Sequence, residues 1–169
     1  MTARSSNLEE RLDSLLRQQR KKISVAESCT GGLVSHRITN VAGSSEYFDS
    51  GVVSYSDQSK IRTLHVLAMT LRKFGAVSQE TAEEMAKGIR KISGTDIGIA
   101  ITGLAGPGGG SIGKPVGLVY VSLSTENDVI TQKFNFKGTR SEIKTQASDA
   151  ALNMVINYLI KEDNENLKI

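Results

Sequence analysis

The feature that most constrains the fold is a regular alternation of short apolar segments with amphipathic ones. Apolar segments of strand length occupy residues 23–27, 51–56 and 96–102, and segments with helical periodicity separate them. Strands that alternate with helices form a sheet with helices packed on its faces. The third segment, DIGIAIT, is almost entirely apolar, which predicts a central strand buried on both faces.

The C-terminal part of the chain departs from this alternation. Residues 116–124 and 128–137 are two strand-like segments joined by a short polar turn, which predicts an antiparallel hairpin. Thr139 and Glu142 have the spacing of a capping box. The apolar stripe behind them predicts a closing helix that runs to Ile160 and is followed by a fraying polar tail.

Four further helices are predicted, at the N-terminus, over residues 32–40 and 57–66, and after a capping Ser78. Together with five strands, they predict an α/β protein, a three-layer α/β/α sandwich on a mixed sheet. We expect one domain over residues 1–169, because no repeat or linker interrupts the pattern. The N-terminal helix is predicted from a leucine stripe formed by Leu8, Leu12, Leu15 and Leu16.

Composition narrows the function classes. The chain has no apolar segment long enough to span a membrane and no signal-peptide core, so we expect a cytoplasmic protein that does not bind membranes. A single Cys29 and two distant histidines, His36 and His65, predict neither a disulfide nor a metal site. Basic residues are dispersed along the chain and aromatic residues are few, so nucleic acid is not an expected partner.

The segment AESCTGG is the first candidate for chemistry, because it turns a strand into a helix through two glycines. The N–H groups at such a turn can bind an anion, and they would stabilise an oxyanion formed at Ser28. The alternative is that Ser28 or Thr30 only caps the helix. Cys29 is not favoured as a nucleophile because no histidine is close in sequence to activate it.

The segment YSDQSK is the second candidate. Tyr55 ends a strand, and Lys60 lies in the turn or helix that follows. A serine nucleophile needs a base, and a lysine can serve if burial lowers its pKa toward neutrality. The alternative is an ordinary surface lysine.

The glycine-rich segment GLAGPGGGSIGKP is the third candidate. Gly108, Gly113 and Lys114 fit the spacing of a phosphate-binding P-loop, but a proline and a strand follow them where the motif requires Ser or Thr and a helix. We therefore expect a ligand-covering loop or a plain connection. Thr102 ends the preceding strand, where open α/β sheets bind ligands. Arg140 either reaches a phosphate or faces solvent.

Five segments together resemble the CinA C-terminal domain family in order and spacing. They are AESCTGGL, GVVSYSDQSK, GAVSQETAEEMAKG, ITGLAGPGGGSIGKPVG and the GTR before the last helix. The resemblance covers residues from about Val25 to the end of that helix. It implies an α/β/α sandwich similar to anticodon-binding domains. It also implies a nicotinamide-nucleotide amidohydrolase, which converts nicotinamide mononucleotide to nicotinate mononucleotide and ammonia in pyridine-nucleotide salvage.

The resemblance also assigns site residues. It implies Ser28 as nucleophile and Lys60 as its base, with Tyr55 beside them, and it implies no cofactor or metal. YSDQSK stands where relatives often have YSNEAK, and GTR lacks the usual acidic or amide residue before the arginine, which weakens the assignment of Arg140. The residues expected to contact the substrate, with its phosphate against a glycine turn, are Thr30, Gly31, Gly32, Thr102, Gly103, Gly106 and Arg140.

A different function class remains open. Relatives carry a competence label, so the alternative is a non-catalytic module that binds a nucleotide or a protein partner. Many relatives also have an N-terminal domain linked to ADP-ribose hydrolysis, for which these 169 residues leave no room. We therefore expect the amidase activity alone, in a homo-oligomer.

Overall fold

The computed structural model describes residues 8–166, and a five-stranded sheet forms its centre. The strands lie in the order β2-β1-β3-β4-β5. Strand β1 runs parallel to β2 and β3, whereas β4 is antiparallel to both of its neighbours, so the predicted mixed sheet and hairpin are confirmed. The strands are β1 Ile23–Glu27, β2 Phe48–Val53, β3 Ile97–Gly103, β4 Leu118–Ser124 and β5 Val129–Asn135.

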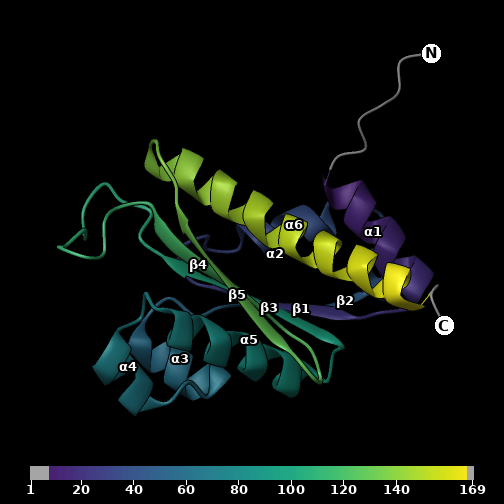
Figure 1. The fold of residues 1–169 in the computed structure, drawn as a ribbon, viewed down its shortest axis with the longest axis horizontal. Helices are drawn as coiled ribbons and strands as arrows, with labels where there is room; N and C mark the ends of the chain where they lie inside the picture. Colours follow the sequence, from purple (N-terminus) through teal and green to yellow (C-terminus); the bar gives the residue numbers. More distant parts are fainter. Residues whose placement is uncertain (1–7, 167–169) are drawn as a thin grey trace.

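Helices cover both faces of the sheet, which confirms the three-layer α/β/α sandwich (Figure 1). One face carries α1 Leu8–Gln19, α2 Leu33–Thr39 and α6 Arg140–Asn166. The other carries α3 Asp57–Leu64, α4 Ala68–Phe74 and α5 Gln79–Ser93. A short 3-10 turn, Ser44–Glu46, precedes β2.

Strand β3 is the central strand and is buried on both faces, as its apolar sequence predicts. Because side chains alternate along a strand, Ile99 and Ile101 enter the core against α1, α2 and α6, whereas Ala100 faces α5. Ala26 on β1 also faces α5. These small residues leave room for a helix. The next residue on this face of β1 is Ser28, and the next on β3 is Thr102.

The structure corrects the predicted bounds of two elements and adds one helix. Strand β2 begins at Phe48, not Gly51, and ends at Val53. Its side chains alternate between half-buried and exposed, as is typical of an edge strand, and such a strand has too few apolar residues for its ends to be predicted from the sequence. Helix α4 was not predicted, because its first turn is capped from α5: Glu84 accepts hydrogen bonds from the Leu67 N–H (2.7 Å) and the Thr70 hydroxyl (2.6 Å). Helix α6 continues past Ile160 to residue 166.

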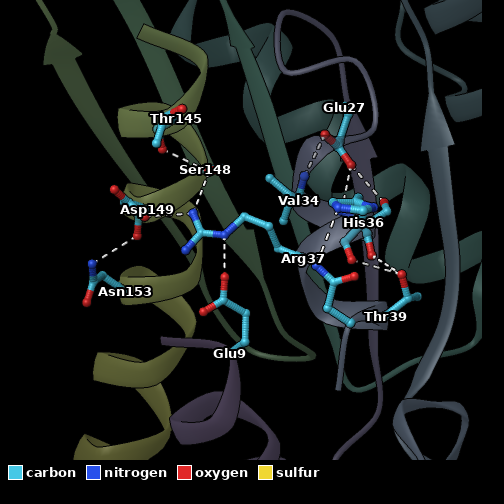
Figure 2. A network of polar contacts seen from close by, with 12 residues as sticks. Glu9, Glu27, Val34, His36, Arg37, Thr39, Thr145, Ser148, Asp149 and Asn153 are labelled. Atoms are coloured by element: carbon cyan, nitrogen blue, oxygen red, sulfur yellow. Dashed lines mark hydrogen bonds and ion pairs between the residues drawn. The ribbon is translucent and has the colours of Figure 1, made fainter. Parts of the chain in front are cut away.

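Polar contacts fix the helices of the α6 face to one another (Figure 2). Arg37 of α2 donates to Glu9 of α1 and to Ser148 and Asp149 of α6, each at 2.6 Å. The predicted capping box at the start of α6 is also present, with the Glu142 carboxylate accepting from the Thr139 N–H (2.7 Å) and hydroxyl (2.8 Å). Arg37 therefore holds α6 beside α1 and α2 at Ser148 and Asp149, and the capping box closes the N-terminus of α6. None of the helices within residues 8–166 is both long and apolar enough to cross a membrane.

Candidate active site

A cavity of about 230 Å³ opens where the parallel strands β1, β2 and β3 end at their carboxyl termini. This edge is the usual ligand-binding position of open α/β sheets. Its volume is below the range of pockets for drug-sized ligands, so it suits a small group. The lining residues are Ser28, Cys29, Tyr55, Lys60, Ala76, Val77, Thr102, Gly103, Leu104, Ala105, Gly106, Gly108 and Arg140.

Ser28 and Lys60 meet inside this cavity. Ser28 follows β1, and the Lys60 Nζ atom, from α3, lies 3.0 Å from its Oγ atom. The first turn of α3 is capped by Ser56, whose Oγ accepts the Ser59 N–H, and this directs Lys60 inward. Lys60 is 0% exposed, which overturns the alternative of a surface lysine.

The surroundings of Lys60 lower its proton affinity. Burial lowers the pKa of Lys60 below its ordinary value, and the charge of Asp57 opposes this only in part. The other neighbours of Nζ are the backbone oxygens of Ser54 (2.8 Å) and Tyr55 (3.3 Å). A neutral amine can donate its two N–H groups to these oxygens and keep its lone pair for the Ser28 hydroxyl proton.

Glu27 closes the N-terminus of α2, a role that the sequence analysis missed. Its carboxylate is fully buried and accepts the N–H groups of Gly32 (3.0 Å), Val34 (3.1 Å) and Ser35 (2.9 Å), as well as the Ser35 hydroxyl (2.7 Å). Figure 2 shows Glu27 over this end of the helix. The only sequence signal was an acidic residue at the end of an apolar strand, directly before a glycine turn.

This arrangement corrects the expectation that the Gly31–Gly32 turn offers donors to a ligand. The Gly32 N–H is taken by Glu27, and the Gly31 N–H donates to the Ser28 carbonyl (3.1 Å). The glycines are needed for the turn itself, since both have a left-handed φ, +62° and +100°. Thr30 is fully buried outside the cavity lining, and its hydroxyl has no partner within residues 8–166.

The remaining predicted residues do line the cavity. Thr102 is buried and donates its hydroxyl to the Ala76 carbonyl (2.7 Å), which joins β3 to the segment before α5. Arg140 reaches across from α6 and donates to the Gly106 carbonyl (2.7 Å) and the Tyr55 hydroxyl (2.9 Å). Tyr55 therefore stands at the rim, with its side chain more than half exposed. Gly103 lies beside these residues where the loop begins.

The loop from Gly103 also supplies unused donors. The backbone N–H groups of Ala105 and Gly106 have no acceptor in the part of the chain that the structure describes, although both residues line the cavity. Lys114 donates to the Phe74 carbonyl (2.6 Å) and strand β4 follows it in place of a helix, so the P-loop interpretation is excluded by geometry. The signal for these donors was the glycine-rich composition alone.

The other reactive side chains are placed less favourably for chemistry. Burial raises the pKa of Cys29 to about 11, so its thiol stays protonated near neutral pH. His36 and His65 are exposed outside the cavity lining. Within residues 8–166, no three His, Cys, Asp or Glu side chains gather in a group that could hold a metal ion.

Comparison with known proteins gives the family. The family model described as CinA C-terminal domain matches residues 5–159. A CinA-like protein of Kosmotoga olearia is 50% identical over 154 residues, and a second CinA-like protein, from Endomicrobium trichonymphae, is 47% identical over 146 residues. These matches cover 91% and 86% of this chain but only 37% and 34% of those proteins, so the chain spans little more than a third of their length.

Solved structures agree with this result. A CinA superfamily protein from Klebsiella pneumoniae is 35% identical, with a TM-score of 0.88 over 91% of this chain and 96% of that one. A competence/damage inducible protein from Agrobacterium tumefaciens is 38% identical, with a TM-score of 0.85 over 93% and 98%. The order of the motifs, the mixed five-stranded sheet and these likenesses lead to one conclusion: the chain belongs to the CinA C-terminal domain family.

Proposed function

We propose that this chain is an amidase that hydrolyses the carboxamide of nicotinamide mononucleotide to nicotinate mononucleotide and ammonia. The observation that carries the proposal is the contact between the Lys60 amine and the Ser28 hydroxyl in a buried site. A protein gains no stability from burying a lysine without a carboxylate partner, because desolvation of the ammonium is costly. Such an arrangement is typical of an activated nucleophile.

In the proposed reaction, Ser28 Oγ attacks the carboxamide carbon while Lys60 takes the hydroxyl proton. The oxyanion of the tetrahedral intermediate needs donors, and the free N–H groups of Ala105 and Gly106 are two candidates in the cavity lining. Lys60 then protonates the leaving nitrogen, and the tetrahedral intermediate expels ammonia, which leaves an ester on Ser28. Lys60 next accepts a proton from the water that attacks this ester, and it returns that proton to Ser28 Oγ as the acid is released and ionises to the carboxylate.

The choice of nicotinamide mononucleotide rests on the family resemblance, and the site is compatible with it. A flat carboxamide ring fits a cavity of about 230 Å³, and the cationic rim at Arg140 suits an anionic substituent outside it. The alternative, a binding module without turnover, gives no role to a buried amine facing a serine hydroxyl.

Ammonia release provides the direct test. Purified protein should release ammonia from nicotinamide mononucleotide, and much less from free nicotinamide or glutamine, which lack the nucleotide. Ser28→Ala, prepared in parallel, controls for contaminating amidases. Absence of ammonia release by the folded wild-type protein at substrate concentrations that saturate binding would leave the binding-module interpretation.

A further inference from the structure

Two cations of α6 stand near the cavity rim without a carboxylate partner. Arg140 and Lys144 are four residues apart, so they lie one turn apart on the same face of the helix. Within residues 8–166 neither side chain forms an ion pair, and Lys144 forms no hydrogen bond. Glu142, the acidic residue between them, directs its carboxylate to Thr139 in the capping box. The positive charge at this position is therefore not neutralised by the protein.

Lys144 is directed toward the turn that follows Ser28. Its Nζ atom lies 3.6 Å from the position that a Cβ atom would take at Gly31. Its charge is also felt at Cys29 inside the cavity, where burial raises the thiol pKa and the charges of Lys60 and Lys144 oppose that rise. Lys144 is half-buried, so its side chain lies partly against the protein.

Three other positions for an anion near the cavity are already occupied, and the proposed function assigns the free N–H groups of Ala105 and Gly106 to the oxyanion. The N-terminus of α2 is closed by the Glu27 carboxylate, Lys60 contacts Ser28, and Lys114 donates to the Phe74 carbonyl. A guanidinium and an ammonium on one helix face provide charge-assisted donors suited to a phosphate. The cavity of about 230 Å³ is below the usual range for drug-sized ligands, so a phosphate ester on a substrate that reacts at Ser28 would lie at the rim.

We propose that Lys144, together with Arg140, forms a subsite for the monophosphate of the substrate, and that Lys144 discriminates a nucleotide from its nucleoside. The inference rests on the proposed function for the position of the carboxamide at Ser28. It replaces the sequence-based expectation that a glycine turn holds the phosphate. The Gly31–Gly32 turn leads the chain from β1 into α2, and the cations of α6 bind the phosphate.

The test measures binding on a Ser28→Ala background, so that no substrate is consumed. Nicotinamide mononucleotide and nicotinamide riboside, which differ only by the phosphate, are titrated by calorimetry. Lys144→Gln should raise the Kd for the mononucleotide about tenfold, the lower limit for loss of a charged hydrogen bond, and change the Kd for the riboside less than about twofold. Lys144→Arg should retain most of the mononucleotide affinity.

Lys137→Gln is the matched control, because it removes the same charge from an exposed position just before α6. It should change the Kd for the mononucleotide less than about twofold. Equal losses in Lys137→Gln and Lys144→Gln would mean diffuse attraction and overturn the subsite. Three other results would overturn the subsite as well. They are an equal loss of affinity for both ligands in Lys144→Gln, an unchanged mononucleotide Kd in that variant, and no mononucleotide binding to Ser28→Ala at millimolar concentration.

The two proposals fail in different ways. If the wild-type protein releases no ammonia from the mononucleotide but Lys144-dependent binding persists, the amidase proposal fails and the phosphate subsite stands. If ammonia is released and Lys144→Gln leaves KM for the mononucleotide unchanged, the subsite alone is wrong. Inorganic phosphate and adenosine monophosphate, tested as competitors, separate a site for any phosphate from one that also requires the nicotinamide ring.

Discussion

Replacement of Lys60 by methionine separates the catalytic role of the amine from its effect on stability. Methionine has a similar length and fills the same buried space, but it cannot accept a proton. Loss of a general base lowers kcat by about 100- to 10,000-fold, and we expect a loss in this range. Lys60→Arg should be equally inactive, because a guanidinium keeps its proton at any working pH.

The same substitution should alter how stability depends on pH. Because burial lowers the pKa of Lys60, the unfolded chain binds its proton up to a higher pH than the folded chain does. The free energy of unfolding of the wild-type protein therefore rises with pH between the folded pKa and about 10.4, by 1.36 kcal/mol for each unit by which the pKa is lowered. Lys60→Met should lack this rise. Its free energy of unfolding should also be lower by an amount that does not depend on pH, because the backbone oxygens of Ser54 and Tyr55 lose their donor.

The assay combines steady-state ammonia release with urea unfolding from pH 7 to pH 10. Lys87→Met, on the exposed side of α5, controls for loss of a lysine charge and should keep wild-type turnover. If Ser28 and Lys60 act as a unit, Ser28→Ala combined with Lys60→Met should be little worse than either single variant. Near-normal turnover by folded Lys60→Met, or multiplicative losses in the double variant, would refute the reasoning.

Three further predictions follow from the site. Cys29→Ala should keep kcat within about threefold, because burial keeps the thiol protonated and outside the proposed chemistry; a loss above about 100-fold would contradict this assignment. Glu27→Gln should lower kcat and lower the free energy of unfolding by about 1–3 kcal/mol, since an amide NH₂ would face the backbone donors of α2. Ser35→Ala, which removes one of the contacts, should lower the free energy of unfolding by less. Urea unfolding and kinetics measure both variants. Prolonged chelation should leave ammonia release unchanged, and activity restored only by a divalent metal would overturn the metal-free mechanism.

Much of the fold could be predicted from local sequence patterns. Strand β3 is apolar throughout because it is buried on both faces, and Ser78 caps α5 through the Thr81 N–H as expected. Edge strand β2 was placed less well and helix α4 was not predicted, since their stability comes from neighbours. Val53 ends a half-buried strand, and the cap of α4 is Glu84, which is distant in sequence from Leu67.

The sequence by itself determined the alternation of strands and helices, the hairpin, the capping box and the candidates Ser28 and Lys60, because each depends on residues close together in the chain. Only the tertiary structure decided what those candidates can do. The proton affinity of Lys60 depends on burial beneath β1 and on the carbonyls that follow β2. The N–H groups of Gly31 and Gly32 are taken by the Ser28 carbonyl and the Glu27 carboxylate, and the cations of Arg140 and Lys144 come to the site from the last helix. Desolvation and charge act through space, so these properties exist only once distant segments have packed together.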